Sequence, residues 1–96
     1  EEFAVVLPET GFSGAKGLAE GIRRSIQDLA IAHEHSQVAP QVTVSIGIAC
    51  AVPTEKDTHM ELVQAADNQL YAAKEAGRNR IQGQEGLRVH EKLDQP

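Results

Sequence analysis

Apolar and polar positions alternate at the start of the chain. Phe3, Val5 and Leu7 fall on one face of an extended segment, and Pro8 ends the pattern. A period of two residues is typical of a strand with one buried face. The sequence therefore predicts a first strand over residues 2–7.

The next stretch changes to the spacing of a helix. From residue 13 to residue 30, apolar residues recur every three or four positions, and the charged residues fall mainly between them. This pattern predicts an amphipathic helix that lies on a sheet. The expected buried positions are Ala15, Leu18, Ala19, Ile22, Ile26 and Leu29.

Residues 41–51 give the clearest strand pattern. Large side chains alternate with small ones, so that one face carries Val42, Val44, Ile46, Ile48 and Cys50. Large residues on one face and small ones on the other indicate a sheet that is covered on both sides. We expect another element to pack closely over Gly47.

A second helix is predicted from about His59 to Ala76. Thr58 and Glu61 have the spacing of a capping box at its start, and Gly77 supplies the left-handed residue that ends it. The expected buried face of this helix consists of Leu62, Val63, Ala66, Leu70 and Ala73. After the helix, a short last strand is predicted near residues 80–82.

The predicted order is strand, helix, strand, helix, strand, which places the chain in the α/β class with helices packed on a central sheet. A helical crossover favours parallel strands. Three strands offer more apolar surface than this chain can cover, so we expect further strands and at least one helix upstream.

Composition limits the partners. The 96 residues suffice for one small domain, and a formal net charge of −5 argues against a duplex nucleic-acid binder. The single cysteine, Cys50, excludes an internal disulfide, and no apolar run reaches the length of a membrane span. Because the chain is acidic, any phosphate ligand should be small.

Two cations flank the end of the second predicted helix. Lys74 and Arg78 are four residues apart, on either side of Gly77. One interpretation is a well-capped helix whose last turn is solvated, since cations are favourable at that end. The other is a phosphate site, in which a Lys point charge and an Arg fork hold phosphate oxygens.

Three segments, in this order and at these separations, resemble the C-terminal portion of a GGDEF domain, the catalytic domain of diguanylate cyclases. They are residues 1–8 (EEFAVVLP), 42–49 (VTVSIGIA) and 66–79 (ADNQLYAAKEAGRN). The resemblance implies the α/β sandwich of nucleotidyl cyclases, with residues 1–83 as the partial domain and 84–96 as a polar tail or linker. The chain begins at the third residue of the Gly-Gly-(Asp/Glu)-Glu-Phe signature, so both glycines are absent.

The family's reaction joins two GTP molecules into cyclic di-GMP and releases two pyrophosphates, with one GTP on each domain of a homodimer. The resemblance assigns Glu1 and Glu2 to catalysis and to binding Mg²⁺ or Mn²⁺, and Lys74 and Arg78 to the β- and γ-phosphates. It implies a cytoplasmic bacterial signalling domain with an upstream sensory or regulatory domain, without nucleic-acid or direct membrane contact. The parent protein could still be anchored to a membrane elsewhere.

Two alternatives stay open. The domain could be a degenerate regulatory module that binds GTP or cyclic di-GMP without turnover, or a generic α/β interaction domain without a nucleotide site. The family's upstream metal-binding Asp and guanine contacts are absent, so we expect this chain alone to be inactive. Gly21 occupies the position where some members carry an arginine of the product-inhibition site.

Overall fold

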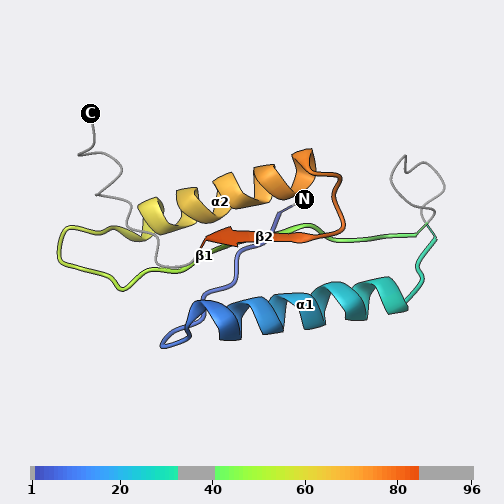
Figure 1. Cartoon of the computed structure of the whole chain (residues 1–96), viewed down its shortest axis with the longest axis horizontal. Helices are drawn as coiled ribbons and strands as arrows, with labels where there is room; N and C mark the ends of the chain where they lie inside the picture. Colours follow the sequence, from blue (N-terminus) through green and yellow to red (C-terminus); the bar gives the residue numbers. More distant parts are fainter. Residues whose placement is uncertain (1, 33–40, 85–96) are drawn as a thin grey trace.

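Two helices enclose a pair of parallel strands in the computed structural model, which describes residues 2–32 and 41–84. Helices α1 and α2 lie on either side of the strand pair (Figure 1). The strands are parallel, with Ile46 opposite Ile81, which confirms the pairing predicted from the helical crossover. The elements are α1 (Phe12–Asp28), β1 (Ile46–Ala49), α2 (His59–Glu75) and β2 (Ile81–Gln84).

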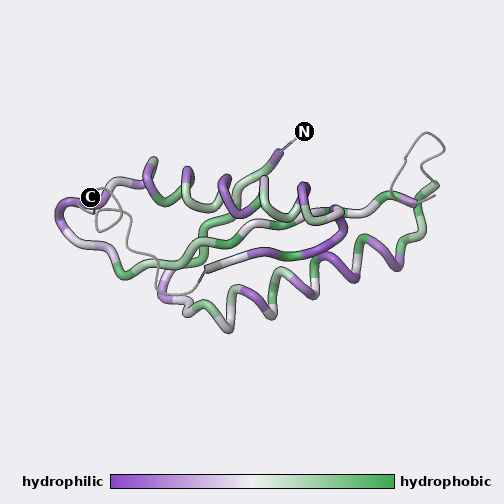
Figure 2. Tube along the Cα trace, turned by 45° about the horizontal axis from the view of Figure 1, so that its top comes forward, coloured by the Kyte–Doolittle hydropathy of each residue, from purple (hydrophilic) through white to green (hydrophobic). Residues whose placement is uncertain are grey.

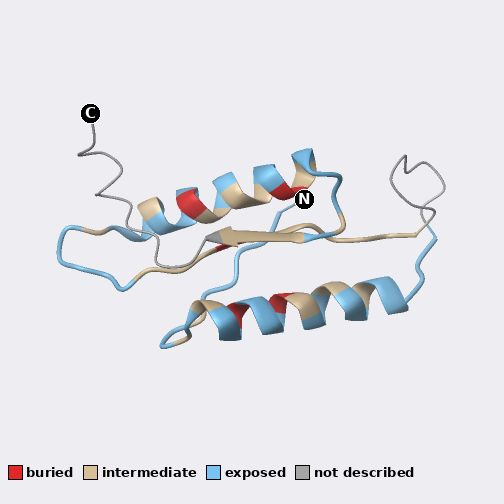
Figure 3. Cartoon of the chain, viewed as in Figure 1, coloured by how far each residue is buried: buried red, intermediate tan, exposed pale blue. Residues whose placement is uncertain are grey.

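The core between α1 and the sheet is small. Ile48 of β1 packs against Ala15 and Ala19 of α1, and these three residues are buried. The buried positions of both helices face the strands (Figure 3). The large side chains of β1 thus face α1, as the alternation predicted. The surrounding half-buried residues are Leu7, Phe12, Ile46 and Ile81.

The opposite face of β1 lies directly against α2. A Cβ at position 47 would lie 2.7 Å from the Cα of Leu70 and would overlap the backbone N of Leu70 and O of Ala66. Only glycine fits such an approach of helix backbone to strand backbone. The close packing predicted over Gly47 is therefore confirmed.

The buried faces of the helices are narrower than predicted. On α1, Leu18 and Leu29 are 47% and 65% exposed. On α2, Val63 is 53% exposed and Ala65 is buried in its place. The cause is the width of the sheet: two strands of four residues cover only the side chains directly above them.

The predicted strand over residues 2–7 is wrong for the described part of the chain. The segment has no strand assignment, and Phe3 and Val6 are 87% and 80% exposed. A strand needs a neighbouring backbone to satisfy its N–H and C=O groups, and this segment pairs with none of the described residues. Leu7 alone of its predicted face joins the core.

The strand predicted over residues 41–51 is also shorter than expected. Among the described residues, Ile46–Ala49 pairs with the four residues of β2, and the rest of the predicted strand is not paired as a strand. Before β1, the chain forms one isolated antiparallel bridge, between Ala32 and Gln41.

Parts of the predicted organisation lie outside the described residues. These parts are Glu1 and, from residue 85 onward, the predicted tail. Neither α1 nor α2 has the length and apolar character that a membrane span requires.

Candidate active site

The end of α2 is built as a Schellman motif. Ala76 is the last residue with helical backbone angles, and Gly77 has a φ of 123°. The backbone N–H of Gly77 donates to Lys74 O at 3.3 Å, and that of Arg78 donates to Ala73 O at 3.0 Å. This pair of bonds satisfies two of the last helix carbonyls. The left-handed glycine predicted at the cap is confirmed, and it fixes the backbone of Arg78 close to Lys74.

An acidic residue from the other end of the sequence meets this cap. Lys74 Nζ lies 3.0 Å from Glu2 Oε2, although the two residues are 72 positions apart. The N-terminal segment reaches this position by passing the sheet and ending beside the last turn of α2 (Figure 1). Both side chains are partly exposed, at 37% for Lys74 and 57% for Glu2, so a ligand from solvent can reach the pair.

Two arginines add to the positive charge at this end. Arg78 and Arg80 follow Gly77 in the turn between α2 and β2, and both are exposed. Arg80 Nε donates to the carbonyl of Arg78 at 3.0 Å, and its Nη2 lies 2.7 Å from where a Cβ of Gly77 would be. The turn is strongly hydrophilic (Figure 2). The place of Arg80 beside the cap was not predicted, although the Arg-Asn-Arg spacing was visible in the sequence.

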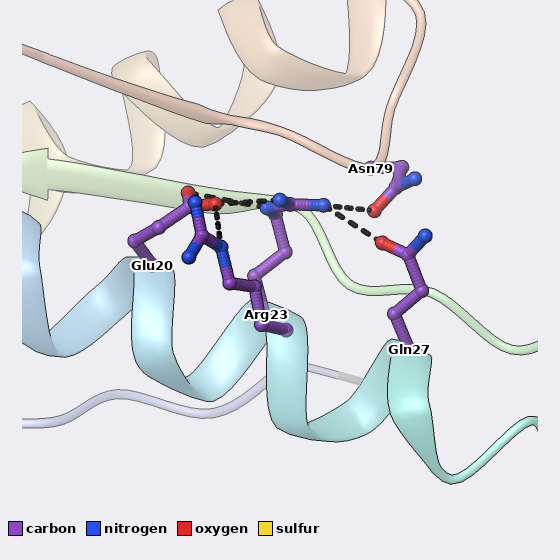
Figure 4. A network of polar contacts seen from close by, with 5 residues as sticks. Glu20, Arg23, Gln27 and Asn79 are labelled. Carbon is purple, nitrogen blue, oxygen red and sulfur yellow. Dashed lines mark hydrogen bonds and ion pairs between the residues drawn. The ribbon is translucent and has the colours of Figure 1, made fainter.

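A polar network fastens the same turn to α1. Arg23 Nη1 donates to Asn79 Oδ1 at 3.0 Å and to Gln27 Oε1 at 2.9 Å. Its Nε and Nη2 donate to both carboxylate oxygens of Glu20, at 3.2 and 2.5 Å (Figure 4). Arg24 Nε donates to the same carboxylate at 3.1 Å.

The network shifts the pKa values of Glu20 and Arg23. The hydrogen bond from Arg23 is the main reason that the pKa of Glu20 lies below its ordinary value. The same hydrogen bond raises the pKa of Arg23. Both shifts favour the charged forms, so the ion pair persists at neutral pH.

The described residues supply only part of a metal site. No three His, Cys, Asp or Glu side chains gather within residues 2–32 and 41–84. Glu2 nevertheless offers an exposed carboxylate, and Mg²⁺ is commonly held by one or two carboxylates together with substrate phosphates. The donor chemistry of Glu2 therefore fits such an ion.

The structure brings together some of the predicted site residues. Glu2 and Lys74 are in contact, and Arg78 follows Lys74 directly across the helix cap. Glu1 lies outside the described residues. The contact between Arg23 and Asn79 was not predicted, because it joins positions 56 residues apart and no local pattern marks it.

Comparison with known proteins gives consistent matches. The sequence profile described as "Diguanylate cyclase, GGDEF domain" matches residues 1–80. Response regulator PleD of Caulobacter vibrioides is 37% identical over 83 residues, which cover 86% of this chain and 18% of PleD. Diguanylate cyclase A of Treponema denticola is 36% identical over 81 residues, or 84% of this chain and 21% of that protein.

A third relative agrees with these two. Probable diguanylate cyclase DgcT of Escherichia coli is 40% identical over 83 residues, covering 84% of this chain and 18% of DgcT. The chain thus spans about a fifth of the length of the curated relatives it matches.

Proposed function

Because this chain belongs to the GGDEF family of diguanylate cyclase domains, we propose that it forms the C-terminal part of a domain that condenses two GTP molecules into cyclic di-GMP. The observation that carries the proposal is the 3.0 Å contact between Glu2 and Lys74. It joins an acid of the signature to a cation of the helix cap, and a metal-bound triphosphate requires groups of both kinds. The parent protein is then a bacterial signalling protein with an upstream sensory or regulatory domain.

In this reaction the 3′-hydroxyl of one GTP attacks the α-phosphorus of the other. The new bond joins that oxygen to phosphorus while the hydroxyl proton passes to water, the bond to the bridging oxygen breaks, and pyrophosphate leaves. The same attack by the second GTP closes the ring and releases the second pyrophosphate. Lys74 and Arg78 bind the β- and γ-phosphates and offset the negative charge that grows on the leaving group. Lys74 contributes a mobile point charge, and Arg78 contributes a planar fork that can bind two oxygens.

Glu1 and Glu2 would hold Mg²⁺ or Mn²⁺ in the loaded enzyme. The ion supplies charge neutralisation at phosphorus and lowers the pKa of the attacking hydroxyl. In the structure, the charge of Glu2 is balanced by Lys74. When the nucleotide binds, Lys74 would leave this contact for the phosphates, and the carboxylate of Glu2 would be free to hold the ion.

The reaction requires two facing domains, each with its own GTP. A homodimer of the parent protein is therefore part of the proposed mechanism. The 96-residue chain alone should be inactive, because it carries only part of the groups that the reaction needs.

The test is turnover by the complete protein that carries this chain. With GTP and magnesium, it should form cyclic di-GMP, detected by chromatography and mass spectrometry. Glu2→Gln should lower kcat at least a hundredfold, because it removes a charged metal ligand. Glu55→Gln, on an exposed loop remote from α2's end, is the control and should keep full activity.

Two results would contradict the proposal. Unchanged turnover in Glu2→Gln would remove that residue from the site. GTP binding without product in the unaltered protein would instead support a regulatory module that binds the nucleotide without turnover.

A further inference from the structure

The turn that carries Arg78 has an unusual backbone. Three consecutive residues have positive φ angles: 123° at Gly77, 62° at Arg78 and 47° at Asn79. Residues other than glycine adopt this region at an energetic cost, and they keep it only where the surroundings fix them. The position of the Arg78 side chain therefore depends on the contacts that hold this turn.

Those contacts come from three elements. The N–H of Arg78 bonds to Ala73 of α2, and the N–H of Asn79 donates to Ser45 Oγ at 3.2 Å, just before β1. The side chain of Asn79 accepts from Arg23 Nη1 of α1 at 3.0 Å (Figure 4). The last contact reaches the turn from the far side of the sheet.

Hydrogen bonds within α1 hold the guanidinium of Arg23 in place beside the turn. Glu20 binds its guanidinium through two oxygens, and Gln27 accepts a third hydrogen bond. The Arg23 side chain is only 17% exposed, whereas that of its neighbour Arg24 is 72% exposed. A guanidinium that is fixed on one side by a carboxylate presents its remaining N–H groups in one direction.

We propose that Arg23 is a positioning residue that sets Arg78 for the triphosphate by holding Asn79. This inference rests on the proposed function. Arg23 does not touch the nucleotide; it acts through Asn79 on the adjacent residue. Its loss should weaken binding of the triphosphate and leave the number of competent sites unchanged.

The experiment is calorimetry of the complete protein with 3′-deoxy-GTP and magnesium. This analogue lacks the attacking hydroxyl and cannot react, so the Kd and the number of sites are both measurable. Arg23→Gln should raise the Kd about threefold to tenfold, a loss of the size expected for one hydrogen bond. Arg24→Gln is the matched control, because Arg24 also binds Glu20 but does not reach the turn, and its Kd should be unchanged.

A second variant tests the same contact in case Arg23→Gln does not fold. Asn79→Gly removes the acceptor but keeps a residue that tolerates positive φ, and it should raise the Kd to a similar extent. An unchanged Kd with fewer binding sites in both variants would mean that Arg23 only stabilises the fold, and would overturn the inference. If Arg78→Ala binds the analogue as well as the unaltered protein, the proposed phosphate site itself is wrong, and the inference falls with it.

Discussion

At the scale of single residues, the glycine at position 47 determines how closely α2 can pack on β1. The backbone of β1 at Gly47 touches the backbone of α2, so no Cβ fits between them. Gly21 has open space around it on the outer face of α1. The same substitution should therefore have opposite effects at the two positions.

Gly47→Ala should lower the free energy of unfolding by about 2 kcal/mol or more, because the added methyl group must push α2 away from the sheet. Gly21→Ala should raise it by about 0.5 to 1 kcal/mol, because alanine loses less backbone entropy in a helix. Urea unfolding followed by circular dichroism measures both. Equal stability of the two variants would contradict the packing described for α2.

At the scale of elements, the sequence predicted the helices well because their signals are local. The capping box at the start of α2 is an example. Thr58 Oγ1 accepts from the N–H of Glu61 at 3.2 Å, as the spacing of the two residues predicted. The end at Gly77 was predicted from a similarly local signal, and the parallel pairing followed from the helix that connects the two strands.

Thr58→Ala should destabilise the fold by about 1 kcal/mol, because the first turn of α2 loses the acceptor for one of its free N–H groups. Thr58→Ser keeps the oxygen and should stay close to the unaltered protein. Thermal unfolding of both variants measures the loss of stability in each. A loss in Thr58→Ser as large as that in Thr58→Ala would show that the methyl group, and not the cap, is responsible.

The elements that were predicted wrongly depend on distant partners. Residues 2–7 alternate as a strand should, but pairing requires a neighbour that local periodicity does not reveal. Val63 was expected on the buried face of α2, but it is exposed, and Ala65 is buried instead. The helix lies so close to the sheet that a small side chain is favoured at the contact. The residue types of the candidate site were proposed through the family resemblance and stay a prediction, whereas the contact between Arg23 and Asn79 had no signal in the sequence.

At the scale of the whole molecule, one polar network joins the two layers of helix. Arg23 of α1 contacts Asn79 beyond the end of α2, and Glu20 holds Arg23 in place. Because the pKa of Glu20 is lowered by folding, its contribution to stability is complete above the ordinary value of 4.5. That contribution is lost as the pH falls through the lowered pKa. The raised pKa of Arg23 has no effect in this range, because arginine stays charged there.

Glu20→Gln should therefore destabilise the protein at pH 7, and the difference from the unaltered protein should shrink as the pH is lowered from 5 towards 3. Urea midpoints across this range give the comparison. Arg24→Gln keeps the contact between Glu20 and Arg23 and should retain most of the unaltered protein's pH dependence. A difference that is constant from pH 7 to pH 3 would show that the ion pair does not couple folding to protonation.

The close contact between the backbones of β1 and α2 at Gly47 also affects the candidate site. Leu70, which rests on this glycine, precedes Lys74 by one turn, or about 6 Å along the helix axis. A helix is stiff over that length. The distance between the backbones of β1 and α2 at Leu70 therefore affects the distance between the ammonium group of Lys74 and the carboxylate of Glu2. A methyl group added at Gly47 would therefore displace the ammonium group of Lys74 on the surface of the protein.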